Sequence, residues 1–193
     1  MATVFYDFDG TLVKHDSLIR FARFSLPFFR FCIGLIKSVP WVLAWKLKFL
    51  TSSYAKEKLF GFWFKCMPEE TFDRKGLEFM SEINKDINNE VFQTLISHKK
   101  DGKKIVIVSA SMENWIKPWA KANGIDIVIG TRPAISTGGV LSGKFATLNC
   151  IGEEKVRRIK ELFPNLNTME TWGYGDSPSD QPMLSIVNHP HMV

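Results

Sequence analysis

Two aspartates, Asp7 and Asp9, stand two residues apart at the end of an apolar run, in the stretch VFYDFDGTLV at residues 4–13. Carboxylates this close repel each other, so a proton, a cation or open water must neutralise them. Mg²⁺ prefers hard oxygen ligands, and a carboxylate can also attack phosphorus or exchange a proton with a substrate. The pair therefore indicates metal binding, acid–base chemistry or covalent catalysis at this point of the chain.

Three further groups of polar residues follow along the chain. Ser109 ends an apolar run in IVSAS, Lys155 lies in GEEKV, and Asp176 and Asp180 lie in GDSPSD. Taken alone, each has a structural interpretation, because a serine can cap a strand end, a lysine can lie on a solvated helix face and GDSPSD can be a loop. Their occurrence together, in this order, favours one shared site.

The elements that would position these residues alternate between strands and helices. Apolar and β-branched runs predict the strands, and amphipathic patterns predict the helices. The expected strands span 3–8, 103–111, 125–130 and 171–177, and the expected helices span 112–124 and 152–163. Such alternation predicts a parallel α/β sheet, in which ligands bind beyond the carboxyl ends of the strands. Asp7, Asp9, Ser109 and Asp176 all fall at such ends.

The segment 15–95 breaks this alternation and reads as a series of helices. The expected helices span 16–25, two stretches that open at Pro27 and Pro40, 54–65, 69–84 and 87–99. Proline suits the first turn of a helix. Glycine-rich turns in 132–150 predict a hairpin or a long loop. We therefore expect a core of residues 1–14 and 96–193, with a helical cap domain at 15–95 inserted after the first motif.

Taken together, DFDGTL, Ser109 in IVSAS, Lys155 in GEEKV and GDSPSD resemble the haloacid dehalogenase (HAD) superfamily of phosphatases over nearly the whole chain. The insert after the first motif resembles the helical cap of subfamily IB, which contains phosphoserine phosphatase. The resemblance implies a Rossmann-like parallel sheet with helices on both faces and an all-helical cap. It also implies a phosphomonoester hydrolase that forms an aspartyl-phosphate.

The resemblance assigns roles to the four aspartates. Asp7 would be the nucleophile and Asp9 the acid and base, and the presence of Asp9 favours a phosphatase over a dehalogenase. Asp7, the backbone carbonyl of Asp9 and Asp176 would hold Mg²⁺, with Asp180 supporting them. The cation would offset the repulsion between the clustered carboxylates.

The resemblance also implies donors for the phosphoryl group in transfer, whose charge spreads over three oxygens. The Ser109 hydroxyl, the Ala110 amide and the Lys155 ammonium would supply them. Fixed donors of this kind contribute roughly 3–4 kcal/mol each.

The substrate is less well defined than the chemistry. Phosphoserine phosphatases carry a glutamate nine residues after the nucleophile to hold the substrate amine, and this chain has Asp16 there. HDSL, NCIGEEKV and SDQPML are similar to the bacterial HAD phosphatases that include phosphatidylglycerophosphatase. The resemblances therefore imply a phosphorylated small molecule or a lipid phosphate such as phosphatidylglycerophosphate.

The cap has an unusual charge pattern, with seven basic residues and no acidic residue between 17 and 56, against a net charge of +5 for the chain. Trp41, Trp45 and Phe49 recur at i, i+4 and i+8. Two interpretations stay open: the aromatic residues form the cap's own core, or residues 17–56 lie on an anionic membrane. Because the basic charge is confined to one segment, we expect no nucleic-acid partner.

The three cysteines are far apart and form no C-x-x-C motif, which favours a reducing cytoplasm, and the first residues lack the pattern of a signal peptide. We therefore expect a cytoplasmic protein, or one peripheral on the inner face of the membrane. The oligomeric state is not predicted. Two other function classes are alternatives: a catalytically silent module that docks on membranes, and a phosphotransferase or a receiver phosphorylated on aspartate. The intact Asp9 argues against both.

Overall fold

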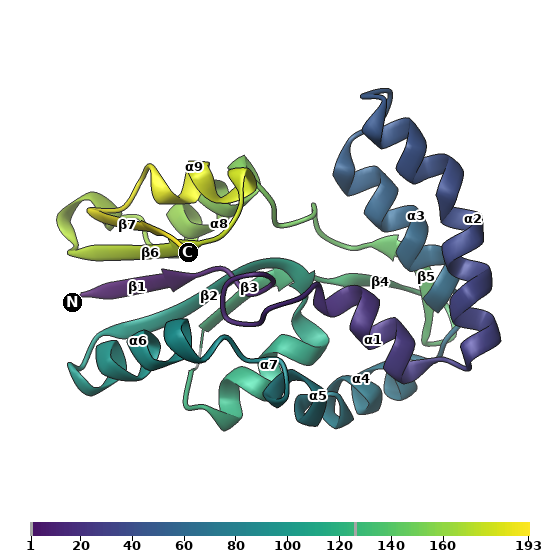
Figure 1. Ribbon diagram of the computed structural model, residues 1–193, viewed down its shortest axis with the longest axis horizontal. Helices are drawn as coiled ribbons and strands as arrows, with labels where there is room; N and C mark the ends of the chain where they lie inside the picture. The colour runs from purple at the N-terminus through teal and green to yellow at the C-terminus, as the bar shows by residue number, and fades with distance from the viewer. Residues whose placement is uncertain (1, 126) are drawn as a thin grey trace.

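The computed structural model describes residues 2–125 and 127–193 (Figure 1). Met1 and Asp126, which the sequence analysis assigned to the core and to the third strand, lie outside the described residues. The strands are Thr3–Tyr6 (β1), Lys104–Met112 (β2), Ile127–Thr131 (β3), Pro133–Ser136 (β4), Val140–Phe145 (β5), Thr171–Gly175 (β6) and His189–Met192 (β7). The α-helices are Ser17–Ser25 (α1), Phe28–Lys46 (α2), Ser52–Phe64 (α3), Glu69–Glu78 (α4), Met80–Asn84 (α5), Asn89–Lys100 (α6), Glu113–Ala122 (α7), Glu153–Leu162 (α8) and Gln181–Leu184 (α9), with 3₁₀ turns at Leu166–Thr168 (η1) and Pro178–Asp180 (η2).

A parallel sheet forms the centre of the molecule. Within the described residues it contains five strands in the order β3-β2-β1-β6-β7, and every neighbouring pair is parallel. The predicted α/β class and the strands β1, β2, β3 and β6 are thereby confirmed. Because the strands share one direction, the carboxyl ends of β1, β2 and β6 meet at one edge of the sheet.

Helices cover both faces of this sheet, as the resemblance implied (Figure 1). On one face, Leu95 of α6 and Trp119 of α7 pack with Tyr6 in one buried apolar cluster. On the other face, Ile159 of α8 and Met183 of α9 pack in a second cluster. Alternating side chains of β1 therefore serve two cores, which fixes the strand that carries the first motif.

The helical segment differs from the prediction at Pro40, which lies inside α2 and does not open a third helix. Proline removes one backbone hydrogen bond and usually kinks or ends a helix, yet here the helix continues because α2 packs along α3. α2 ends at Lys46, so Phe49 lies in the following turn and not on one helical stripe with Trp41 and Trp45.

The predicted division into a core and a cap stays a prediction. Aromatic rings of the helical segment, including Phe21, Phe64 and Phe72, contact Trp115 of α7 or one another, so the two parts share one apolar cluster. The hairpin predicted in 132–150 is confirmed as the antiparallel pair β4–β5, and it packs on α3.

Asp86 joins the loop after β1 to the turn that precedes α6. Its buried carboxylate contacts His15 Nδ1 at 2.7 Å and pairs with Arg20. Burial acts to raise the pKa of Asp86. The hydrogen bonds with His15 and Arg20 outweigh burial and hold the pKa of Asp86 below its ordinary value. We expect Asp86→Asn to lower the free energy of unfolding at pH 7 by about 1–3 kcal/mol.

The contribution of Asp86 should be fully present above its unfolded pKa of about 4 and be lost as the pH falls through the lowered folded value. Urea unfolding of both proteins at pH 7 and pH 3 measures this. A difference between wild type and variant that is equal at the two pH values would contradict the assignment.

Candidate active site

Asp7 lies directly after β1, at the carboxyl edge of the sheet. Its backbone N–H donates to the Tyr174 carbonyl of β6 at 2.9 Å, which fixes the first motif beside the fourth. Gly10 has a φ of +83°, and a Cβ there would lie 2.2 Å from Asp176 Oδ2. The glycine of DFDGT therefore lets the turn after Asp9 approach the Asp176 carboxylate.

The Lys155 ammonium bridges two of the predicted carboxylates. Its Nζ donates to Asp7 Oδ1 at 2.5 Å and to Asp180 Oδ1 at 2.6 Å, and all three side chains are buried. Burial raises the pKa of Asp7 to about 7, with Lys155 opposing the rise and Asp180 and Asp9 adding to it. Burial alone would lower the pKa of Lys155, but its pairing with Asp7 and Asp180 raises it above the ordinary value. The lysine therefore stays charged within an excess of carboxylates.

Both carboxylate oxygens of Asp9 are held from neighbouring elements. The Ser111 hydroxyl donates to Oδ2, and the Ser17 N–H donates to Oδ1 at 3.0 Å. Burial raises the pKa of Asp9, the nearby Asp16 carboxylate adds to the rise, and Lys56 opposes it. A carboxyl group that holds its proton above the usual range is suited to protonate a leaving group.

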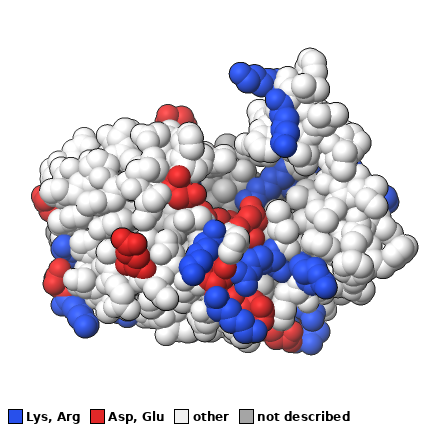
Figure 2. Space-filling view, in the orientation of Figure 1, with Lys and Arg blue, Asp and Glu red and all other residues white. Residues whose placement is uncertain are grey.

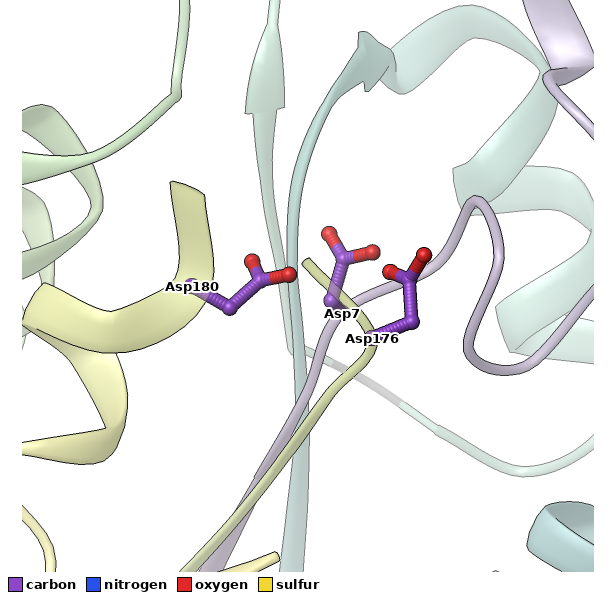
Figure 3. A group of neighbouring side chains, drawn as sticks. All are labelled: Asp7, Asp176 and Asp180. Atoms are coloured by element: carbon purple, nitrogen blue, oxygen red, sulfur yellow. The ribbon is translucent and has the colours of Figure 1, made fainter. Parts of the chain in front are cut away.

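Asp7 and Asp176, which follow β1 and β6, and Asp180 of η2 form a group of oxygen donors (Figure 3). One carboxylate oxygen from each lies within 4.8 Å of the others. Burial raises the pKa of Asp176, and Asp180 adds to the rise. The Thr11 hydroxyl donates to Asp176 Oδ1 at 3.2 Å. An oxygen-only group with surplus negative charge fits a hard cation such as Mg²⁺.

The C-terminal part of β2 brings Ser109 and Ala110 to the same place. Ser109 is buried, and its Oγ accepts the Ser111 N–H at 3.0 Å, which leaves the hydroxyl proton available for donation to a ligand. The Ala110 carbonyl accepts from Lys56 Nζ at 3.2 Å and from Thr131 Oγ1 at 2.9 Å. These bonds hold the end of β2 between α3 and β3.

A cavity of about 370 Å³ opens over these groups. It is lined by most of the predicted site residues together with their neighbours: Asp7, Asp9, Gly10, Lys14, Asp16, Lys56, Ser109, Ala110, Ile151, Lys155, Asp176, Ser177 and Ser179. Asp180 does not line this cavity and contacts the group through Lys155. A larger hollow of about 560 Å³ between α4 and α7 is lined by Glu69, Arg132 and their neighbours, away from the motifs. We place the site in the smaller cavity because the clustered ionisable groups are there.

Asp16, predicted to contact the substrate, has a structural role as well. Its Oδ1 accepts the Ile19 N–H at 3.0 Å and so caps α1, and its side chain also lines the cavity. Lys14 and Lys56, which were not predicted from the sequence as site residues, also line the cavity. A basic residue five positions from Asp9 is a weak local signal for Lys14, and no local pattern marks Lys56.

Several known proteins are similar to this chain in sequence or in fold. A protein from Mycobacterium tuberculosis named a probable phosphatase is 28% identical over an alignment of 211 residues, gaps included. The alignment covers 98% of this chain and 67% of the relative. A structure from Bordetella pertussis, described as a protein with unknown function, has a TM-score of 0.84 at 22% identity and covers 98% of this chain and 88% of its own.

A phosphoserine phosphatase structure in apo form has a TM-score of 0.69 at 16% identity, and the match covers 98% of this chain and 84% of the other. At this identity the similarity shows the fold, which is the α/β fold observed here. Residues 4–185 match the haloacid dehalogenase-like hydrolase family, a span that includes all four motifs. The chain therefore belongs to the haloacid dehalogenase-like hydrolases.

Proposed function

We propose that this chain is a Mg²⁺-dependent phosphomonoester hydrolase that works through an aspartyl-phosphate on Asp7. The observation that carries the proposal is the buried Asp7 carboxylate, which lies 2.5 Å from Lys155 in the same cavity as Asp9. The relative named a probable phosphatase and the fold of phosphoserine phosphatase support it.

The reaction would proceed in two steps. First, an oxygen of Asp7 bonds to phosphorus while the ester oxygen leaves with the proton of Asp9. Then water attacks phosphorus, Asp9 takes a proton from that water, and the bond between Asp7 and phosphorus breaks to release inorganic phosphate. Burial, which raises the pKa of Asp9, keeps the proton available for the first step.

The phosphoryl group in transfer needs donors around its oxygens. We assign the Ser109 hydroxyl, the Ala110 amide and the Lys155 ammonium to this role. Ser109 and Lys155 are held by other hydrogen bonds before substrate arrives, so little reorganisation is needed during the reaction.

Asp7, Asp176 and the Asp9 carbonyl would hold Mg²⁺, with Asp180 beside them. When bound, the cation would offset the negative charge of the carboxylates and of the substrate phosphate. Asp180 accepts a hydrogen bond from Lys155 and so orients the lysine toward Asp7.

Mg²⁺ should stabilise the folded chain, because the clustered carboxylates of Asp7, Asp176 and Asp180 repel one another without it. At a hundred times its Kd, the cation is expected to add about 2.7 kcal/mol to the free energy of unfolding. Thermal melting with and without Mg²⁺ measures this, with Asp176→Asn as the variant and Asp101→Asn, in an exposed turn, as the matched control. An equal Mg²⁺ effect on both variants would contradict the assigned ligands.

Within this chemistry we favour a lipid phosphate such as phosphatidylglycerophosphate. Basic residues and exposed apolar side chains of the helical segment support it. Phosphoserine or another small phosphomonoester is the second candidate, supported by Asp16 in the cavity wall and by the phosphoserine phosphatase fold. A lipid substrate would place the protein in the cytoplasm at the inner face of the membrane. A catalytically silent docking module is the alternative of another class.

Mg²⁺-dependent phosphate release from phosphatidylglycerophosphate in mixed micelles, phosphoserine and p-nitrophenyl phosphate tests the proposal. We expect turnover of p-nitrophenyl phosphate and faster turnover of the lipid. Release from the soluble esters alone would support the phosphatase and overturn the lipid substrate. No release from any of the three would favour the silent module.

A further inference from the structure

The hairpin of α2 and α3 has an apolar outer face. Phe29, Ile36, Leu43 and Leu47 recur along one side of α2 and its C-terminal end, and Phe49 follows in the turn. Phe29, Ile36 and Phe49 are 75%, 70% and 78% exposed. Surface helices of globular proteins normally turn a polar side outward, so this face is unusual. By length and composition alone, α2 could even cross a membrane.

The opposite side of α2 is already packed within the protein. A Cβ on Gly34 would lie 2.1 Å from Trp63 Cδ1, so glycine permits close contact between α2 and α3. Trp63 Nε1 donates to the Phe31 carbonyl at 3.0 Å, and Ser38 is buried on the same side. The fold therefore uses the inner side of α2, and in the part of the chain described the outer side remains exposed.

Basic residues border this outer face. At 100° per residue, Arg30 and Lys37 lie on one side of the apolar row and Lys46 lies on the other. No acidic residue occurs between 17 and 56. Figure 2 shows basic and uncharged groups, but no acidic ones, on the part of the hairpin that projects from the molecule at upper right. An apolar row bordered by basic residues complements an anionic phospholipid surface.

The hairpin also adjoins the catalytic cavity. Lys56, about one helical turn after the residues 47–51 that join α2 to α3, lines the cavity and donates to the Ala110 carbonyl. A surface bound through this turn would lie near the cavity, whereas the outer face of α2 points away from α3 and does not line the cavity.

We propose that the outer face of α2 and the turn 47–51 dock on a bilayer that contains anionic phospholipids, with α2 lying along the interface. Docking on the bilayer would give the cavity access to a lipid phosphate, and only this purpose of the docking rests on the proposed function. Two apolar side chains that enter the interface should each contribute substantially to partitioning.

Co-sedimentation with phosphatidylcholine vesicles, with and without 30% phosphatidylglycerol, tests this docking. We expect the partition coefficient to rise at least tenfold with the anionic lipid and to fall in high salt. Ile36→Asp/Leu43→Asp should lower it at least tenfold. The matched control, Leu77→Asp/Leu162→Asp, replaces two exposed leucines on other helices and adds the same negative charge. It should bind like wild type. Lys37→Glu/Lys46→Glu should also lose binding, whereas Lys100→Glu/Lys121→Glu should retain most of it.

Several results would overturn the proposal. Equal losses in the hairpin variant and its control would show that bulk charge, and not this face, governs binding. If the chain does not bind vesicles but forms a dimer, and Ile36→Asp/Leu43→Asp dissociates that dimer, the outer face would be assigned to contact with a second copy of the chain. Resistance to alkaline carbonate extraction would show a spanning helix. Turnover of p-nitrophenyl phosphate by the same variants reports the proposed function separately, because these residues lie outside the cavity.

Discussion

Asp7→Asn is expected to reduce phosphate release by about 10⁴-fold or more, because the amide cannot form the aspartyl-phosphate. The substitution keeps the shape of the side chain and leaves Lys155 paired with Asp180. Steady-state release of phosphate from p-nitrophenyl phosphate measures the effect. Turnover within tenfold of wild type would show that Asp7 is not the nucleophile.

The stability of the same variant separates catalysis from folding. Burial raises the pKa of Asp7 to about 7, so the folded state disfavours its ionised form. That cost is absent below the unfolded pKa of about 4, grows as the pH rises and is complete above the folded pKa. Without Mg²⁺ at pH 8, Asp7→Asn should therefore be at least as stable as wild type in urea. A clear loss of stability there would contradict this electrostatic account.

Lys155→Met is the second substitution with a large expected effect. It removes the cation that contacts both Asp7 and Asp180, whose side chains are buried. Breaking a buried ion pair by removing one partner typically costs about 3–5 kcal/mol. Loss of one electrostatic donor should also reduce turnover by about 10²–10³-fold. We expect both losses at neutral pH.

Urea unfolding and phosphate release measure the two effects of Lys155→Met. Lys160→Met is the matched control, because Lys160 lies on the exposed side of the same helix. It should leave stability and turnover nearly unchanged. Similar behaviour of the two variants would show that the buried ion pairs do not support the site.

Local sequence predicted most of the central sheet because β1, β2 and β3 are continuous apolar runs. β7 was not predicted, since HPHM lacks such a run. Its pairing with β6 is accompanied by stacking of His189 on Trp172 and of His191 on Tyr174, contacts that arise from the tertiary structure and leave no local pattern. Pro40 misled the helix prediction because its effect depends on the packing of α2 along α3.

The candidate site was predicted where its residues follow strands. Asp7 and Asp176 directly follow β1 and β6, and Ser109 lies near the carboxyl end of β2, so their proximity follows from the topology of one parallel sheet. Lys56 could not be predicted in this way, because its place in the cavity depends on how α3 packs beside β2. The ion pair between Lys155 and Asp180 likewise depends on how α8 and η2 are placed beyond the sheet.

Trapping the covalent intermediate tests the central claim most directly. Borohydride reduces an acyl phosphate to an alcohol, so it would convert phosphorylated Asp7 to homoserine. Asp9→Asn should slow the second step more than the first, because p-nitrophenolate can leave without a proton. This variant would be mixed with p-nitrophenyl phosphate and Mg²⁺, reduced, and analysed by peptide mass spectrometry. We expect homoserine at position 7, dependent on substrate and absent from Asp7→Asn. An unmodified residue 7 during turnover, or reduction at another carboxylate, would contradict the proposed mechanism.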